Sequence, residues 1–395
     1  MKNKVLIFVP YQDEDNFYMD GILTREYSIL YWLFLKGYTN VISVKKPRTI
    51  LDNKKYKIME EYFQNGSIEF NLKKIIDNSL TVQYKKKFSM EQIAKKRIWW
   101  TKGYKSIAST ISKHLDFEKN EYLVYSNNPF AYELISILKN LGCNIYFDVM
   151  DNFSIHPSLL NNERQEALKG YINVFKNADI ISANSEQTCN YMKEYTQKKV
   201  HLVKNGVFTS NEIQKNDLEQ FHRLVEYKNK YKKCIGYIGK IGKRLDADLI
   251  EKISKAKPDY LFVFVGYYLK DQVNPKLTRL FKEDNNVIHI NGIPSAFVYK
   301  FMNEFDILTI PHSVGKNENG GDPLKLYQYL TRNKPIITTP ILGVSEFKDY
   351  IKISDSPEEW INFIKNPNSL QKEVNTENFS WNKRLEPIYM FLEEL

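Results

Sequence analysis

The stretch YLFVFVG, residues 260–266, is a run of six apolar or aromatic residues that ends at a glycine. Strands that are apolar at every position are typical of parallel sheets covered by helices on both faces. Four similar stretches lie in the same half of the chain: KCIGYIG (233–239), NVIHING (286–292), FDILTIPH (305–312) and PIITTP (335–340). Helical patterns separate them, so this half is predicted to be a doubly wound α/β domain.

The first half of the chain shows the same alternation, less regularly between residues 46 and 120. Its strand-like segments are VLIFVP, NVISV, YLVYS, NIYFDV, ADIISAN and KVHLV. We therefore predict an α/β protein with two Rossmann-like domains, residues 1–204 and 205–375, followed by a C-terminal helix, residues 376–395. Two such domains facing each other leave a cleft beyond the carboxyl ends of their strands, where ligands usually bind.

The overall composition limits the partners and the cellular location that we expect for the protein. The chain has 395 residues and a net charge of +10, which favours anionic partners. No apolar run approaches the roughly 20 residues of a membrane span. The short apolar run at the N-terminus lacks a cleavage site for a signal peptidase. The three cysteines have no metal or redox spacing, so we expect a reduced, cytoplasmic protein, with the inner face of the plasma membrane as one location.

A basic segment with interleaved aromatic residues, residues 83–105, has two interpretations. It could be an amphipathic surface that lies on an anionic membrane, or a solvated helix whose aromatic residues enter the core. Binding of single-stranded nucleic acid would use similar residues. No nucleic-acid module is visible in the sequence, so nucleic acid is not an expected partner.

The stretch GGDPLKLYQYL, residues 320–330, places a lysine at an unfavourable point of a helix. Asp322 is a good N-cap and Pro323 suits the first helical position, so the helix is predicted to start here. Lys325 then lies in the first turn, where a cation opposes the helix dipole. A bound anion would offset that penalty. The alternative is a capped amphipathic helix with a solvated polar face.

Several segments together resemble glycosyltransferases of the GT-B fold that use nucleotide-sugar donors. Four pieces carry the resemblance: ADIISANSEQTCNYM (178–192), KVHLVKNGVF (199–208), IGYIGKIGKRLDADLI (235–250) and DPLKLYQYLTRNKPIITTP (322–340). The last resembles the variant found in capsule and teichuronic-type transferases. The resemblance implies an acceptor-binding first domain, a donor-binding second domain and a C-terminal helix that crosses back to the first domain.

The resemblance also implies a donor site. The family places cations for the donor diphosphate in the loop after the first strand of the second domain, where glycines and cations form a plausible phosphate cradle. Lys325 matches the family lysine that reaches the nucleotide or its phosphates. His312 ends a strand facing the cleft and could touch the sugar. The donor-binding candidates are Lys240, Lys243, Arg244, Ile293, His312, Asp322, Lys325, Gln328 and Tyr329.

The chain departs from the large retaining families at this helix. Those families carry two glutamates here, whereas this chain has Gly320 and Gln328 at the corresponding positions. Inverting relatives show a similar lysine and glutamine pattern, so retention and inversion both stay open. No metal site and no cofactor beyond the nucleotide sugar are expected. Asp246 and Asp248 imitate an Asp-x-Asp metal motif, but they more plausibly start a helix.

The first domain offers carboxylates for catalysis. An inverting transferase needs a general base to accept the proton of the acceptor hydroxyl. Asp151, after the strand NIYFDV, is the first choice for that base and Asp148 is the second. The alternative is that one of them caps the following turn. Acidic residues after the first strand are candidates for acceptor contacts, although each could be an ordinary loop acid: Asp13, Asp15 and Asp20, with Gly21 beside them.

The sequence thus predicts a glycosyltransferase that moves a sugar from a nucleoside-diphosphate sugar, with UDP as first choice, to a glycan or lipid-linked glycan of a bacterial surface polysaccharide. Two alternatives stay open. One is a catalytically inactive GT-B subunit that partners another transferase, which the missing glutamate pair favours. The other is a nucleotide-sugar epimerase, which shares the two-domain architecture.

Overall fold

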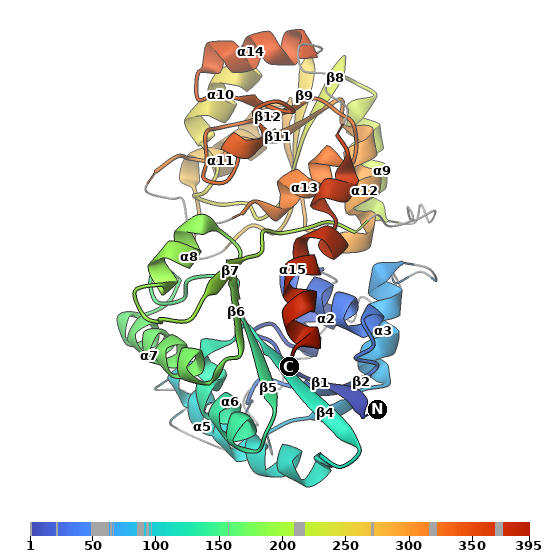
Figure 1. Cartoon of the computed structure of the whole chain (residues 1–395). Helices are drawn as coiled ribbons and strands as arrows, with labels where there is room; N and C mark the ends of the chain where they lie inside the picture. Colours follow the sequence, from blue (N-terminus) through green and yellow to red (C-terminus); the bar gives the residue numbers. More distant parts are fainter. Residues whose placement is uncertain are drawn as a thin grey trace. The chain divides into compact units, whose positions relative to one another are not determined.

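The chain forms two compact units in the computed structural model, and Figure 1 follows it from blue to red. Unit 1 comprises Met1–Lys204 and Trp381–Leu395, and unit 2 comprises Asn205–Ser380. The structure describes residues 2–20, 23–48, 63, 65, 67–84, 91, 95, 97–156, 158–208, 218–269, 272–315, 322–367 and 374–395.

Unit 1 is built on a parallel sheet that, among the described residues, has seven strands in the order β3-β2-β1-β4-β5-β6-β7. Strand β1 is an interior strand that pairs in parallel with β2 and β4, so that Ile7 stands beside both Ile42 and Val124. The strands are β1 (Asn3–Val9), β2 (Asn40–Val44), β3 (Leu80–Val82), β4 (Asn120–Ser126), β5 (Asn144–Val149), β6 (Ile180–Ala183) and β7 (Val200–Leu202).

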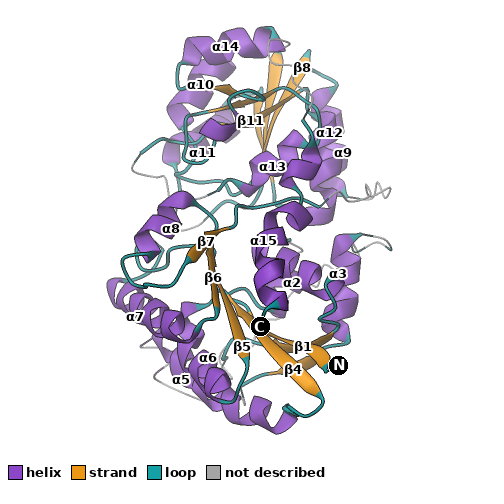
Figure 2. Cartoon of the chain, viewed as in Figure 1, coloured by secondary structure: helices purple, strands orange, loops and turns teal. Residues whose placement is uncertain are grey.

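Helices cover both faces of this sheet (Figure 2). One face packs against α5 (Arg97–Ile111), α6 (Tyr132–Asn140) and α7 (Asn161–Asn177), whose apolar residues share one buried cluster with the sheet. The other face carries α2 (Arg25–Leu35), against which the C-terminal helix α15 (Trp381–Glu393) packs. The remaining helices are α1 (Glu14–Asp20), α3 (Ile68–Asp77) and α8 (Glu186–Met192).

A buried ion pair joins the elements on the second face. Arg25, the first residue of α2, binds the Asp148 carboxylate of β5 through two nitrogens, at 2.8 and 2.9 Å. Ser182 of β6 donates a further hydrogen bond of 2.6 Å to that carboxylate, and the Trp381 ring lies 5.4 Å from the guanidinium. Burial opposes the charge of Arg25, but Asp148 outweighs it and raises the pKa of the guanidinium.

Unit 2 repeats the architecture with a parallel sheet that has six strands in its described part, in the order β10-β9-β8-β11-β12-β13. The five stretches predicted as strands correspond to β8–β12, because each is mostly apolar and almost wholly buried. The strands are β8 (Lys233–Ile238), β9 (Tyr260–Val265), β10 (Val287–Ile290), β11 (Ile307–Ile310), β12 (Ile336–Thr338) and β13 (Lys352–Ile353).

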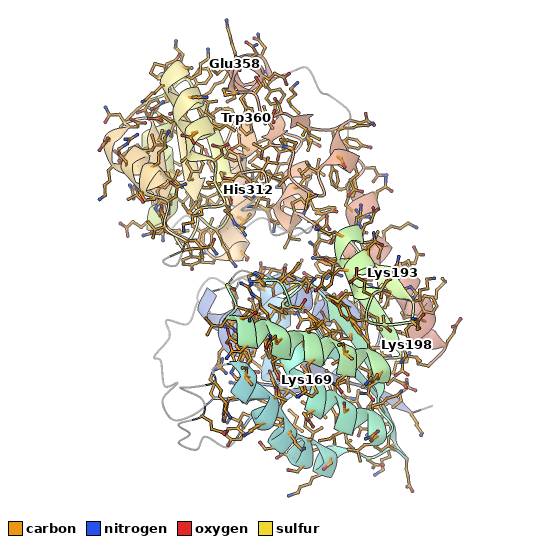
Figure 3. All side chains as sticks on the ribbon, turned by 90° about the vertical axis from the view of Figure 1, so that its left-hand side faces the viewer. Lys169, Lys193, Lys198, His312, Glu358 and Trp360 are labelled. Carbon is orange, nitrogen blue, oxygen red and sulfur yellow. The ribbon has the colours of Figure 1, made fainter. Side chains whose placement is uncertain are left out.

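The helices of unit 2 also lie on both faces of its sheet (Figure 2). Helices α10 and α14 pack against each other and share a buried cluster with β8 and β9; it includes Trp360, which is labelled in Figure 3. The helices are α9 (Glu219–Lys228), α10 (Ala247–Ala256), α11 (Pro275–Glu283), α12 (Val298–Glu304), α13 (Leu324–Leu330) and α14 (Pro357–Lys365).

The start of α13 differs from the prediction. Its N-cap is Pro323, and no side chain caps the helix, so the prediction that Asp322 is the N-cap is wrong. The Asp322 carboxylate instead accepts hydrogen bonds from the Asn205 backbone N–H and, at 2.6 Å, from the Tyr327 hydroxyl. Asp246, in contrast, does start a helix: its carboxylate accepts a 2.9 Å hydrogen bond from the Leu249 N–H and caps α10.

The described part of the basic segment 83–105 packs its aromatic residues inward. Trp99 is buried, and Trp100 contacts the rings of Tyr11 and Phe130 with centroids 6.0 Å away in both cases. Two of its lysines pair with acids, Lys102 with Glu91 and Lys105 with Glu133. These contacts favour the core interpretation for α5; residues 85–90, 92–94 and 96 lie outside the described residues.

The helices that the structure describes include none that is both long enough and apolar enough to cross a membrane.

Replacing Arg25 by alanine is expected to destabilise the protein by about 3–5 kcal/mol, because it leaves the Asp148 charge buried without its partner. Urea unfolding followed by tryptophan fluorescence measures the change. Lys230→Ala, which removes an exposed pair with Glu226, is the matched control and should leave the unfolding midpoint nearly unchanged. An unfolding midpoint for Arg25→Ala equal to that of the control would contradict a structural role for the ion pair.

Candidate functional site

Three polar side chains meet at the carboxyl ends of β8 and β11 in unit 2. The Lys325 ammonium, in the first turn of α13, lies 2.8 Å from the Tyr237 hydroxyl and 3.3 Å from Nε2 of His312. Tyr237 belongs to β8 and its hydroxyl is 3.1 Å from the same His312 nitrogen. Figure 3 labels His312, which follows β11. The lysine also lies over the Tyr237 ring, 4.3 Å from its centroid.

A glycine makes room for the lysine. Gly239 follows β8 with a φ of +155°, and a Cβ added there would lie 2.6 Å from the Lys325 ammonium nitrogen. It would also lie 2.8 Å from the Tyr237 hydroxyl oxygen. Only glycine leaves both groups in place at this position. The loop that begins here is therefore shaped around Lys325.

The same loop supplies three further cations. Lys240 and Lys243 are exposed, and Arg244 is partly buried. The Nε atom of Arg244 is buried and has no hydrogen-bond partner. An unpartnered buried donor on a charged group is costly unless a ligand completes it.

Among the described residues, the charges that act on this cluster are all positive. Burial lowers the pKa of Lys325 well below its usual value, and Arg244 and Lys240 lower it further. Burial also lowers the pKa of His312, with Lys325 and Arg244 adding to the effect. Among the described residues, no carboxylate contributes to either shift. The cluster therefore has uncompensated positive potential, which suits an anionic ligand.

The other candidates of unit 2 have varied surroundings. Tyr329 is buried, and its hydroxyl accepts a 2.8 Å hydrogen bond from the Ile238 N–H, so its contact supports the end of β8. Ile293 is buried in the turn after β10, and Gln328 is partly exposed on α13. Asp322 holds the Asn205 backbone, as described above. The structure thus brings Lys325, His312, Arg244 and Lys240 together, leaves Lys243 exposed on the same loop, and gives Tyr329 and Asp322 supporting contacts.

In unit 1 the two candidate aspartates, Asp148 within β5 and Asp151 after it, lie in opposite environments. Asp148 is completely buried and held by Arg25 and Ser182. Asp151 lies beyond the strand end and is exposed; its backbone carbonyl accepts a 2.6 Å hydrogen bond from the Tyr171 hydroxyl. The fixed backbone leaves the Asp151 carboxylate open to solvent. Of the two, Asp151 is the one that could meet a substrate hydroxyl.

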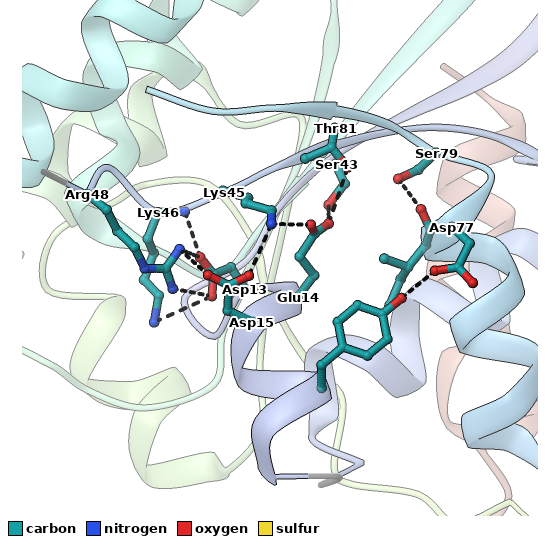
Figure 4. Close-up of polar contacts among 12 residues, drawn as sticks. Asp13, Glu14, Asp15, Ser43, Lys45, Lys46, Arg48, Asp77, Ser79 and Thr81 are labelled. Carbon is teal, nitrogen blue, oxygen red and sulfur yellow. Dashed lines mark hydrogen bonds and ion pairs between the residues drawn. The ribbon is translucent and has the colours of Figure 1, made fainter. Parts of the chain in front are cut away.

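The acids after β1 form an ion-pair network with the cations after β2 (Figure 4). Asp13 is buried and binds Arg48 through both carboxylate oxygens, at 2.6 and 2.9 Å. Asp15 pairs with Arg48 at 2.9 Å and with Lys45 at 3.0 Å. Glu14 pairs with Lys45 at 2.6 Å. These acids are therefore engaged with protein cations. The acceptor candidate Gly21 and the Asp20 side chain lie outside the described residues.

Two residues with notable surroundings, Tyr237 and Glu26, are not among the candidates predicted from the sequence. Tyr237 stands inside the quoted strand IGYIG, where a tyrosine among apolar residues was the available signal. Glu26, on α2, is completely buried, and the donors near its carboxylate, from Thr24 and the Gln12 backbone, do not reach full hydrogen-bond geometry. Burial raises the pKa of Glu26 and outweighs the opposing effect of the nearby donors, and the Asp151 charge adds a small effect in the same direction as burial. A glutamate in the apolar run of α2 was its only signal.

Comparisons with known proteins place the fold. No family model matches the chain. A curated protein, TuaH of Bacillus subtilis (strain 168), whose name assigns it to teichuronic acid biosynthesis as a glycosyltransferase, is 27% identical over 223 residues. That match covers 52% of this chain and 52% of TuaH, so the chain spans about half the length of the curated relative it matches.

Solved structures match over the whole chain. Anabaena HepE in complex with UDP and glucose has a TM-score of 0.65 and 12% identity, covering 99% of this chain and 100% of HepE. Sucrose-phosphate synthase from Thermosynechococcus elongatus has a TM-score of 0.68 and 11% identity, covering 100% and 99%. The trehalose 6-phosphate synthase from Burkholderia multivorans has a TM-score of 0.63 and 10% identity, covering 100% and 99%. The predicted fold class, GT-B, is confirmed.

Replacing Glu26 by glutamine is expected to stabilise the protein at pH values above the raised pKa of Glu26, by about 1–3 kcal/mol. Because burial raises the folded-state pKa of Glu26, its contribution to stability is present at low pH and is lost as pH rises through that pKa. The variant should therefore show a flatter dependence of unfolding temperature on pH than the parent protein. Scanning calorimetry between about pH 5 and pH 8 measures it. Parallel pH profiles for the two proteins would rule out an ionisable, destabilising Glu26.

Proposed function

We propose that this protein is a glycosyltransferase that moves a sugar from a nucleoside-diphosphate sugar to a glycan or lipid-linked glycan. The observation that carries the proposal is the cluster of Lys325, Arg244, Lys240 and His312 at the strand ends of unit 2, in which no described acid balances the cations. A diphosphate is the part of a nucleotide sugar that such a cluster would bind.

The cluster also has a role in the chemistry. When the bond between the anomeric carbon and the diphosphate breaks, negative charge develops on the leaving phosphate oxygen. Cations already fixed at that position stabilise the charge without further reorganisation. The proposal gives this task to Lys325 and Arg244, supported by the exposed Lys240, and requires no divalent metal.

UDP is the first choice of nucleotide and a bacterial surface polysaccharide is the first choice of product. HepE, which shares the fold over the whole chain, has been solved with UDP and with UDP-glucose. TuaH, similar over about half of its length, is named for teichuronic acid biosynthesis. A lipid-linked acceptor would bring the enzyme to the cytoplasmic face of the membrane.

Asp151 is the proposed general base of an inverting transfer. It would accept the proton of the acceptor hydroxyl while that oxygen forms the new bond to the anomeric carbon and the diphosphate leaves. Its exposed carboxylate, at the end of β5, supports this choice. Asp148 is assigned a positioning role instead, because its oxygens are occupied by Arg25 and Ser182.

Lys325→Ala is expected to weaken UDP binding by about 10- to 100-fold, because it removes a charge-assisted contact to the diphosphate. A thermal-shift screen against UDP, GDP, CMP and dTDP, followed by calorimetric titration of the nucleotide that binds, measures the effect. A nucleotide at a hundred times its Kd adds about 2.7 kcal/mol to stability. Lys282→Ala, an exposed lysine on α11, is the control. Equal affinities of Lys325→Ala and the control would refute the donor-site assignment.

Asp151→Asn is expected to reduce the rate of UDP release from UDP-sugars by about 100-fold or more, while UDP affinity stays the same, because only proton transfer is lost. A coupled assay for UDP, with and without glycan acceptors, gives the rate. Glu118→Gln, an exposed acid that precedes β4, is the control. Near-normal turnover of Asp151→Asn would remove it as the base. UDP binding with no turnover by the parent protein would favour the inactive-subunit alternative.

A further inference from the structure

The hydrogen bonds around Lys325 can satisfy either protonation state of its amine. The Tyr237 hydroxyl lies 2.8 Å from the amine nitrogen and 3.1 Å from the Lys240 carbonyl oxygen. A charged Lys325 donates to the Tyr237 oxygen, while the hydroxyl proton is donated to that carbonyl. A neutral Lys325 accepts the hydroxyl proton instead, and its own N–H can donate to Nε2 of His312, 3.3 Å away.

Charge decides between these two arrangements. Among the described residues, the titratable and charged groups that act on Lys325 are Tyr237 of β8, Lys240 and Arg244 of the following loop, and His312 after β11. Arg244 and Lys240 repel an ammonium, and none of the described groups in this set is an acid. In this environment, with Lys325 partly buried, the charged amine is disfavoured until an anion arrives.

We propose that Tyr237 and His312 hold Lys325 as a neutral amine in the free protein, and that Lys325 takes up one proton from solvent when the donor diphosphate binds. The proposal rests on the proposed function, since it concerns the same site. The free protein, the anionic donor and one proton combine to give the complex with a lysine ammonium against a phosphate oxygen. Tyr237 is then a positioning residue, which acts on the donor through Lys325.

The direction of the pH dependence follows from this linkage. The pKa of Lys325 is lowered in the free protein by burial and then by Arg244 and Lys240, and a bound diphosphate would raise it again. Between those two pKa values, binding requires a proton that the free protein lacks. The Kd for the donor therefore rises with pH, by up to about tenfold per pH unit for uptake of one proton.

Calorimetric titration of the full chain with UDP-glucose tests the proposal. Titrations in two buffers with different ionisation enthalpies, between about pH 6.5 and pH 8.5, give the number of protons taken up per UDP-glucose bound. We expect uptake that increases with pH and approaches one proton. Lys325→Arg should bind UDP-glucose without this uptake, because a guanidinium stays protonated throughout the range.

Each result supports or overturns a distinct claim. Binding of UDP-glucose by the parent protein without proton uptake overturns the inference and leaves the proposed function standing. Uptake that persists in Lys325→Arg assigns the proton to His312 or another group and also overturns it. If UDP-glucose and UDP both fail to bind, the proposed function with UDP falls, and this inference with it.

Tyr237→Phe tests the positioning role separately. It is expected to weaken UDP-glucose binding by about three- to tenfold and to move the midpoint of the pH profile of Kd, because both protonation states lose a partner. Circular dichroism checks that the variant is folded. A purely structural tyrosine would lower the unfolding temperature and leave the pH profile in place, which would overturn the role of Tyr237.

Discussion

The Arg25–Asp148 ion pair is the interaction on which unit 1 depends. It connects the first turn of α2 to β5, reaches β6 through Ser182 and receives the Trp381 ring of α15 over its guanidinium. Elements from both ends of the chain therefore meet at one buried charge pair. Removing either partner alone would leave a charge in an apolar setting, which is far more costly than losing an exposed ion pair. Because its carboxylate is bound in this pair, Asp148 has a structural role. The next acid along the chain, Asp151, is the one that lies at the surface.

The two units handle charge in opposite ways. In unit 1, the acids Asp13, Glu14 and Asp15 are balanced by Lys45 and Arg48, at distances between 2.6 and 3.0 Å. In unit 2, Lys325, Arg244 and Lys240 gather at the strand ends, and the shifts of Lys325 and His312 involve no described acid. Balanced networks of this kind stabilise loops. A cluster of cations without acids destabilises the free protein, and a bound ligand of opposite charge removes that destabilisation. The proposed donor site follows from this difference.

Strands β8–β12 of unit 2 could be predicted because each is almost continuously apolar, whereas the two-residue strand β13 was not predicted. The cations of the loop after β8 could be predicted as candidates because they follow a strand within a glycine-containing segment. Contacts between distant residues could not be predicted in this way. Asp322 was expected to cap its own helix, but its carboxylate binds the backbone of Asn205, a long way back in the chain. The sequence pattern indicated that Tyr237 was an ordinary apolar residue of its strand, but its hydroxyl contacts the Lys325 amine. Whether an acid is paired or open, as with Asp148 and Asp151, depends on residues that only folding brings near.

The position of α15 has a consequence for the order in which the protein can fold. Unit 1 consists of Met1–Lys204 and Trp381–Leu395, with all of unit 2 between them in the sequence. During synthesis, the sheet of unit 1 emerges early, but the helix that packs on α2 and places Trp381 over Arg25 emerges only after all of unit 2. Until then the aromatic surface around Trp32, which contacts Tyr389 in the finished fold, has no cover. Unit 2 is contiguous in the sequence and can fold before α15 is available, so unit 1 stays incomplete, with apolar surface open to aggregation, until α15 has been synthesised.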